Sequence, residues 1–154
     1  MNERLLQYIW QHQHFNAYDL TTTRGERLEI LDQGEYNRNQ GPDFLHARIK
    51  MAGRLWVGNI ELHIDASDWY RHAHDEDANY NNVILHVVWN DDAEIALKGQ
   101  PVPMLVLNSR VPRLLLEQYG RLLAKQQFIP CEKCIRRIEE IKWKAWKERL
   151  LIER

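Results

Sequence analysis

The pattern of apolar and polar residues in the first half of the chain predicts one helix followed by three strands. Leu5, Leu6, Ile9 and Trp10 recur at helical spacing and predict an amphipathic helix over residues 3–14. Polar and glycine-rich stretches at 16–25 and 34–41 predict loops. The predicted strands are residues 26–32, 44–51 and 55–65, with Gly53 turning the second strand into the third.

The third strand, Leu55 to Asp65, has the clearest alternation. Side chains of successive strand residues point to opposite faces of a sheet. We expect one face to pack against a core and the other to be solvated. The apolar face carries Trp56, Gly58, Ile60, Leu62 and Ile64, and the polar face carries Asn59, Glu61, His63 and Asp65.

The second half of the chain predicts one buried strand, a hairpin and two helices. A polar connection over 66–82, partly helical, precedes a strand over 83–89 that is apolar on both faces. Residues 94–97 and 102–107 predict a hairpin around Lys98-Gly99-Gln100. A helix from Pro112 to about Gln127, with Leu114, Leu115, Leu122 and Leu123 facing inward, is broken by Pro130, and a final helical segment starts at Cys134.

This order of elements predicts an α/β domain with a mixed β-sheet flanked by helices. We place the core domain at residues 1–130 and the start of a helical C-terminal segment at 131–154. The periodicity of that segment continues to Arg154 without a capping Gly or Asn. We therefore expect a truncated segment, with Trp146, Leu150 and Leu151 partly exposed, that self-associates or packs against a missing C-terminal region.

Composition narrows the class of protein. With 154 residues, 44% hydrophobic and 28% charged, the chain suits one globular domain. No apolar run approaches the roughly 20 residues of a membrane span, and the N-terminus lacks a signal sequence. Two cysteines give no disulfide framework. We expect a cytoplasmic protein with no membrane partner.

The formal charge of −1 is unevenly distributed. Residues 1–109 carry nine Lys and Arg against 16 Asp and Glu, whereas residues 110–154 carry 12 against six. An acidic region concentrates cations, and a basic segment can meet phosphates. A solvated basic helix is the simpler interpretation of the C-terminal excess, and contact with nucleic acid is the alternative.

The strongest candidate site combines Asp43, Glu61 and His63. Glu61 and His63 are two residues apart on one face of the third strand, where they can share a metal ion or act as an acid/base pair. Asp43 follows Gly41-Pro42 at the mouth of the second strand. Pairing through the Gly53 turn would bring it toward Glu61 and His63. Oxygen-rich ligands suit Mg²⁺ or Mn²⁺, and more imidazoles would favour Zn²⁺. The alternative is an exposed Glu and His on a solvated sheet.

Further polar residues could be accessory to this site. They are Asp68, His72, His74 and His86. His86 lies in an apolar strand and is either a hydrogen-bonded core histidine or part of the site. The pair His72 and His74 is either a wet surface or a metal or phosphate contact. Cys131 and Cys134 lack the second ligand pair of a zinc site, so we interpret them as free thiols. No organic cofactor is expected.

Three long blocks of this sequence resemble a bacterial family catalogued as domain of unknown function 2851. The blocks are GPDFLHARIKM, LWVGNIELHI and SDWYRHAHDEDANYNNVILHVVW, and the likeness extends to LTTTRGERLEIL and FIPC. The resemblance implies no particular activity. Members of that family continue past the position of Arg154, in line with the uncapped helix.

A second resemblance concerns the PD-(D/E)XK nuclease-like superfamily. Pro42-Asp43, followed by Glu61-Leu62-His63, is similar to its motif of an Asp opening one strand and an acid and a Lys two apart on the next. This resemblance implies a restriction-endonuclease-like core in which Asp43 and Glu61 bind Mg²⁺ or Mn²⁺. His63 takes the lysine position but lacks a permanent positive charge. Lys50 is a candidate for supplying that charge.

Two functions from different classes follow. The first is a metal-dependent nuclease-like hydrolase that cleaves phosphodiester bonds, with Asp43, Glu61 and His63 as catalytic residues. The second is a non-catalytic binding or assembly module built on a degenerate nuclease-like fold. The missing lysine favours the second, and the convergence of suitable polar groups favours the first.

Overall fold

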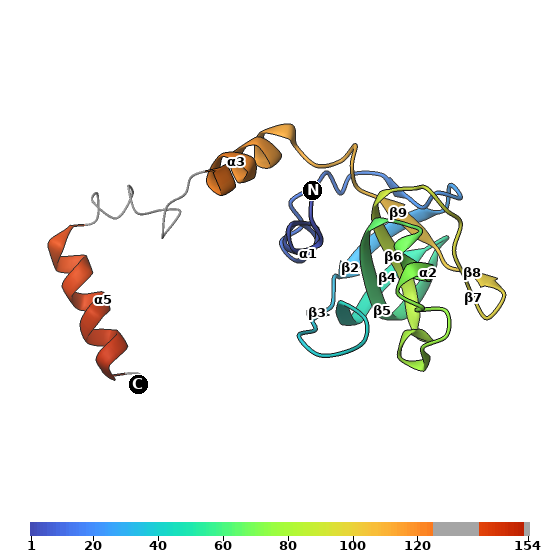
Figure 1. Ribbon diagram of the computed structural model, residues 1–154, viewed down its shortest axis with the longest axis horizontal. Helices are drawn as coiled ribbons and strands as arrows, with labels where there is room; N and C mark the ends of the chain where they lie inside the picture. The colour runs from blue at the N-terminus through green and yellow to red at the C-terminus, as the bar shows by residue number, and fades with distance from the viewer. Residues whose placement is uncertain (125–138, 153–154) are drawn as a thin grey trace. The chain divides into compact units, whose positions relative to one another are not determined.

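The computed structural model describes residues 1–124 and 139–152 (Figure 1). The chain divides into two compact units, Met1–Arg113 and Leu114–Arg154, which we describe separately. Within the described ranges, no helix has the length and apolarity needed to cross a membrane.

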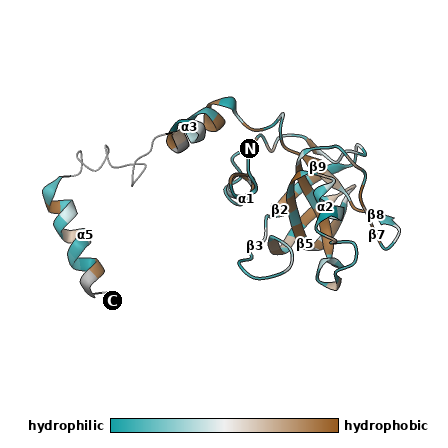
Figure 2. Cartoon of the chain, viewed as in Figure 1, coloured by the Kyte–Doolittle hydropathy of each residue, from teal (hydrophilic) through white to brown (hydrophobic). Residues whose placement is uncertain are grey.

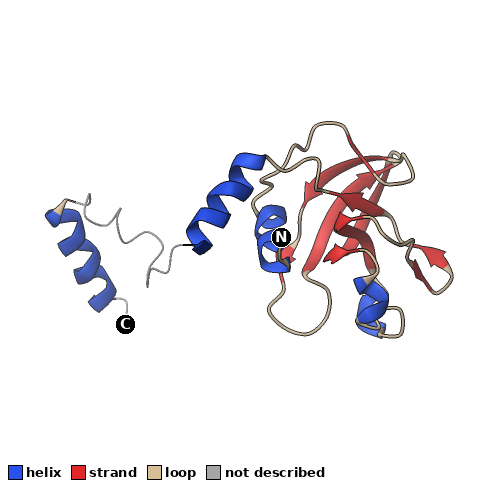
Figure 3. Ribbon diagram, turned by 45° about the horizontal axis from the view of Figure 1, so that its top comes forward, coloured by secondary structure: helices blue, strands red, loops and turns tan. Residues whose placement is uncertain are grey.

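The first unit is built around a mixed sheet, which confirms the predicted α/β class (Figures 1 and 3). The strands hydrogen bond in the order β1-β2-β4-β5-β6-β9, and β3 pairs with β4. Pairing is antiparallel from β1 to β5 and parallel between β5, β6 and β9. The strands are β1 Leu20–Thr21, β2 Arg27–Asp32, β3 Glu35–Tyr36, β4 Phe44–Met51, β5 Arg54–Asp65, β6 Val83–Asn90, β7 Ala96–Leu97, β8 Gln100–Pro101 and β9 Met104–Val106.

The sheet curls until its two edges nearly meet. Just beyond β1, the Thr23 N–H donates to the carbonyl of Met104 in β9 at 2.9 Å. The Arg110 guanidinium, which follows β9, donates to the carbonyls of Tyr18 and Asp19 at 3.1 and 3.2 Å. These contacts satisfy backbone groups that open sheet edges would leave unpaired.

Helices and loops cover the two faces of the sheet. In Figures 1 and 3, α1 (Glu3–Gln11) lies on one side of the strands and α2 (Asp68–Arg71) on the other. α1 packs against β5 and buries its apolar stripe, including Trp10, which is fully buried and stacks on Phe15. The opposite face is covered by α2, the 3₁₀ turn Ala78–Tyr80 and residues that follow β6. Much of the sheet is accordingly hydrophobic in Figure 2.

The sequence predicted β2, β4, β5 and β6 to within a residue or two, and the structure corrects the segment after β6. The predicted hairpin is present but shorter: β7 pairs with β8, and the Val102 N–H donates to the Ile95 carbonyl at 3.1 Å. β9, which was predicted to continue this hairpin, joins the main sheet parallel to β6. The apolar run at 102–107 could pair either with 94–97 or with the edge of the main sheet. Which partner it takes depends on which strand edge is free in the fold. Trp56, predicted to face the core, is 41% exposed and lies near the turn of the β4–β5 hairpin.

In the second unit, the described residues form α3 (Arg113–Ala124, which starts one residue before the unit) and α5 (Glu140–Ile152). Leu114 and Leu122, predicted to face inward along α3, are exposed. In α5, Trp146 is 52% exposed and stacks on Trp143 with ring centroids 5.2 Å apart. The predicted boundary at residue 130 and the Cys131–Cys134 pair lie outside the described residues.

Gly58 is required where β6 begins beside β5. A Cβ at this position would lie 2.4 Å from Ile84 Cγ2 and 2.5 Å from the carbonyl oxygen of Asn82. Gly58→Ala is therefore expected to destabilise the sheet by about 1–3 kcal/mol, the usual effect of overpacking. Urea unfolding measures this change. As a control, Gly120→Ala adds the same methyl group where no atom lies within 4 Å, so it should not lower the free energy of unfolding. If Gly58→Ala were as stable as the wild type, the packing argument would be wrong.

Candidate metal-binding site

Two hydrogen bonds join Asp43 to Glu61 and its neighbour Leu62. The Asp43 N–H donates to Glu61 Oε2 at 3.0 Å, and the Leu62 N–H donates to Asp43 Oδ2 at 3.1 Å. From α1, the Gln7 side-chain amide donates to Asp43 Oδ1 at 2.8 Å. Glu61 is buried and Asp43 half-buried. The two acids whose convergence the sequence suggested are therefore neighbours.

A bulge in β4 decides which face Asp43 joins. The β4–β5 hairpin turns at Ala52-Gly53, both with positive φ as a two-residue turn requires. Ala47 pairs with Gly58, yet Phe44 pairs with Ile60, so β4 gains one residue. His46, with φ of 60°, lies in this irregularity. Without the extra residue Asp43 would align with Leu62 on the opposite face; with it, Asp43 aligns with Glu61.

Burial makes ionisation of both carboxyl groups unfavourable. Desolvation, followed by the charge of Glu61, raises the pKa of Asp43 to about 8, although bonds from Leu62 and Gln7 act in the other direction. Desolvation likewise raises the pKa of Glu61 to about 8. Near neutral pH the pair retains protons unless another positive charge takes their place.

Four histidines gather beside Glu61. His63 and His86 come from the adjacent parallel strands β5 and β6, and His72 and His74 come from the connection between them. His63 Nδ1 lies 2.8 Å from His86 Nε2, and His63 Nε2 lies 3.1 Å from His72 Nδ1. One nitrogen from each of His63, His72 and His74 falls within 4.8 Å of the other two.

Aromatic packing holds the connecting segment over this face of the sheet. The His74 ring stacks on Tyr80 with centroids 3.8 Å apart and on His63 at 5.1 Å. Trp69, fully buried in α2, meets the rings of His74 and His86 at 5.5 and 5.4 Å. No sequence pattern indicated a role for Tyr80 or Gln7, whose positions depend on contacts between distant segments.

Glu61 links the acid pair to the histidine cluster. Its Oε1 lies 3.3 Å from His74 Nε2 and 3.6 Å from His63 Nε2. The His74 Nε2 atom is buried without a hydrogen-bond partner among the described residues, since its contact with Glu61 lacks hydrogen-bond geometry. Desolvation, then the neighbouring histidines, lowers the pKa of His63 to about 2, and desolvation lowers that of His86 to about 3. Both imidazoles are neutral at pH 7, and each ring nitrogen of His63 contacts a nitrogen of a neighbouring histidine.

The prediction of a solvated polar face on β5 is wrong. Glu61 is 5% exposed and His63 is 1% exposed. Alternation along a strand identifies two faces but not what covers them, and here the 66–82 connection folds back over the polar one. Asp68 is also buried, but it pairs with Arg71 and accepts the Asp65 N–H rather than joining the three-histidine group.

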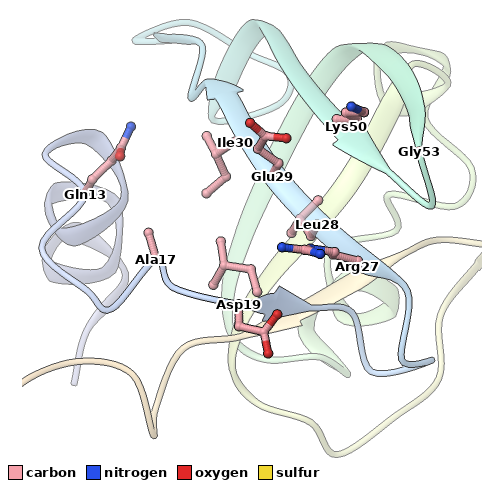
Figure 4. Close-up of a pocket in the computed structure, with 10 residues that line it drawn as sticks. Gln13, Ala17, Asp19, Arg27, Leu28, Glu29, Ile30, Lys50 and Gly53 are labelled. Carbon is pink, nitrogen blue, oxygen red and sulfur yellow. The ribbon is translucent and has the colours of Figure 1, made fainter.

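Lys50 does not supply the missing positive charge. It pairs with Leu55 near the hairpin turn, at the opposite end of β4 from Asp43. There it borders a hollow of about 410 Å³ with Arg27, Glu29 and Asp19 (Figure 4). None of the candidate site residues lines this hollow. The charge of Arg71, by contrast, contributes to the lowered pKa of His63.

The fold and the site together define an α/β protein with a buried carboxylate–histidine cluster on a mixed, nearly closed sheet. The chain belongs to the family described as protein of unknown function (DUF2851), whose model matches residues 3–154. No curated protein and no solved structure gave a significant match.

Proposed function

We propose that this protein is a metal-dependent hydrolase of phosphodiester bonds with a nuclease-like site, in which Asp43 and Glu61 bind a divalent cation. The observation that carries the proposal is the hydrogen bond from the Asp43 N–H, just before β4, to the Glu61 carboxyl group on β5, with the Leu62 N–H donating back to Asp43. It joins the two halves of the motif that resembles PD-(D/E)XK nucleases. A restriction-endonuclease-like core is part of this proposal.

The acid pair fits a hard divalent cation such as Mg²⁺ or Mn²⁺. Carboxylate oxygens are the preferred ligands of both ions, and Glu61 and Asp43 resist ionisation without a compensating charge. Such a cation, when bound, acidifies a bound water and offsets charge on a phosphoryl oxygen. Neutral His63, two residues from Glu61, can hydrogen bond an attacking water and orient it, whereas its lowered pKa makes it a weak base.

Positive charge near the site supports a phosphate-containing substrate. Arg71 is exposed at the end of α2 and pairs with Asp68. Guanidinium groups bind phosphate oxygens in bidentate geometry. Nucleic acid is the substrate class that this proposal assigns.

A non-catalytic binding or assembly module is the second candidate. The observation that favours it is the burial of Glu61 and His63, at 5% and 1% exposure. A substrate must reach the cation through the half-buried Asp43 and the exposed His72. On this alternative, cation binding would stabilise the fold without cleavage.

Cleavage of labelled single- and double-stranded DNA and RNA in Mn²⁺ or Mg²⁺ tests the proposal. We expect the wild type to cut at least one of these substrates and Asp43→Asn to lose about 100-fold or more of that activity, because a cation ligand is removed. Asp91→Asn, which makes the same change at an exposed site, is the control. Cation binding without cleavage of any substrate would favour the binding module.

A further inference from the structure

We propose that His63 Nε2, His72 Nδ1, His74 Nε2 and Glu61 Oε1 form a nitrogen-rich site for Zn²⁺. The geometric case for this site is independent of catalysis, whereas its role beside Asp43 rests on the proposed hydrolase function. It differs from the oxygen-rich Asp43–Glu61 pair in its ligand atoms and shares only Glu61 with it.

Three of the distances between these atoms match those around a four-coordinate ion. Zinc binds imidazole nitrogen at about 2.0–2.1 Å, so ligands at the corners of a tetrahedron lie roughly 3.3 Å apart. The measured separations are 3.1 Å between His63 and His72, 3.3 Å between Glu61 and His74, and 3.6 Å between Glu61 and His63. One nitrogen from each of the three histidines also lies within 4.8 Å of the other two, so the donor atoms are gathered close to ligand spacing.

A buried nitrogen without a partner points to the same place. His74 Nε2 is buried and makes no hydrogen bond within the described part of the chain, although buried polar groups ordinarily have one. It faces Glu61 Oε1, and its ring is fixed by stacking on Tyr80. A metal ion would satisfy this nitrogen, since neutral imidazole offers a lone pair.

His86 is suited to orient the metal ligand His63. If His63 Nε2 binds metal, its proton resides on Nδ1, which lies 2.8 Å from the acceptor His86 Nε2. Metal-binding histidines commonly donate their second ring nitrogen to a neighbouring acceptor, which fixes the tautomer and the ring. His86 is fully buried and pairs with Glu61 across β5 and β6. Because it contacts His63 and is not itself one of the proposed ligands, we call it a positioning residue.

Three imidazoles and one carboxylate favour zinc over magnesium. Mg²⁺ prefers six oxygen ligands in octahedral geometry, whereas imidazole nitrogens suit Zn²⁺. A zinc ion here would place a fixed double positive charge beside His63. His63 occupies the position at which the PD-(D/E)XK motif has lysine. The histidine cluster would thereby replace the lysine charge with that of a bound metal.

Calorimetric titration of the metal-free full chain with Zn²⁺ tests the site, with absorption of the Co²⁺ complex as a second readout of tetrahedral geometry. Cys131→Ser/Cys134→Ser serves as the background so that thiols do not contribute. We expect one Zn²⁺ per chain. His72→Gln should weaken binding by more than the roughly 10- to 100-fold typical of losing a second-shell partner. Because His72 is exposed, this variant should fold. His14→Gln, also exposed, is the matched control.

The outcomes separate this inference from the hydrolase proposal. Absence of stoichiometric Zn²⁺ binding, or equal affinity in wild type, His72→Gln and His74→Gln, would overturn the zinc site even if Mg²⁺ supports cleavage. Zinc binding that survives in Asp43→Asn, while cleavage is lost, supports both proposals. Zinc binding with no cleavage under any metal leaves the site in place and counts against the hydrolase.

Discussion

Glu61→Gln is expected to melt at a higher temperature than the wild type when divalent cations are absent. Desolvation raises the pKa of Glu61 to about 8, so its charged form is unfavourable in the folded protein. A neutral amide removes that penalty. It also retains an oxygen to accept the Asp43 N–H and adds an N–H that can donate to the unpartnered His74 Nε2.

The advantage of this variant should grow with pH. Glu61 and Asp43 have raised pKa values in the folded state, about 8 against roughly 4 in the unfolded chain. Their stabilising contribution is fully present below pH 4 and is lost as the pH rises toward 8, because only the unfolded state releases protons in that window. His63 and His86 act in the opposite sense, since their lowered pKa values destabilise the fold below about pH 6.5.

Added cation should reverse the order of the two proteins. A cation at 100 times its Kd stabilises the wild type by about 2.7 kcal/mol, and Glu61→Gln should lose this gain because it removes a charged ligand. Thermal melts at pH 5, 7 and 8.5, with and without Mn²⁺ or Zn²⁺, measure both effects. Glu29→Gln, on the exposed face of β2, is the control. If cation-free Glu61→Gln melted at a lower temperature than the wild type at pH 8.5, the Glu61 carboxylate would not destabilise the folded protein.

Trp69→Ala should destabilise the first unit by about 3–5 kcal/mol, the usual effect of removing a fully buried aromatic side chain. Trp69 belongs to a buried cluster with Tyr80, Val83 and Ile95, among others, and meets the rings of His74 and His86. It therefore attaches the connection that carries His72 and His74 to the sheet. Metal binding at the histidine cluster should weaken in parallel, even though Trp69 is no ligand.

Trp69→Phe is the matched variant for this prediction. Its ring fills much of the same volume, and it removes an indole N–H that is buried without a partner in the described residues. We expect a loss of less than about 1.5 kcal/mol, as for other core swaps that nearly conserve volume. Urea unfolding measures both variants. Equal stability of Trp69→Ala and Trp69→Phe would mean that the aromatic packing does not hold the connection.

The sequence by itself determined the strands that carry the site. The alternation over β5, the continuous apolar run of β6 and the Gly53 turn between β4 and β5 specify three strands. Because the two strands of a hairpin run side by side, the start of β4 lies beside the end of β5 whatever the length of the strands. The approach of Asp43 to Glu61 could therefore be predicted. The family membership of the chain was likewise visible in blocks of local sequence.

Only the tertiary structure decided the face and the surroundings of these residues. The bulge at His46 changes the register by one residue and so moves Asp43 onto the face of Glu61, and the sequence around it carries no glycine to mark the irregularity. The cover over that face comes from the 66–82 connection, whose Trp69 and Tyr80 find their partners in segments distant along the chain. Periodicity indicates which residues share a face of the sheet. Their burial depends on what packs against that face, and burial in turn sets the pKa values and the metal preference of Glu61 and His63.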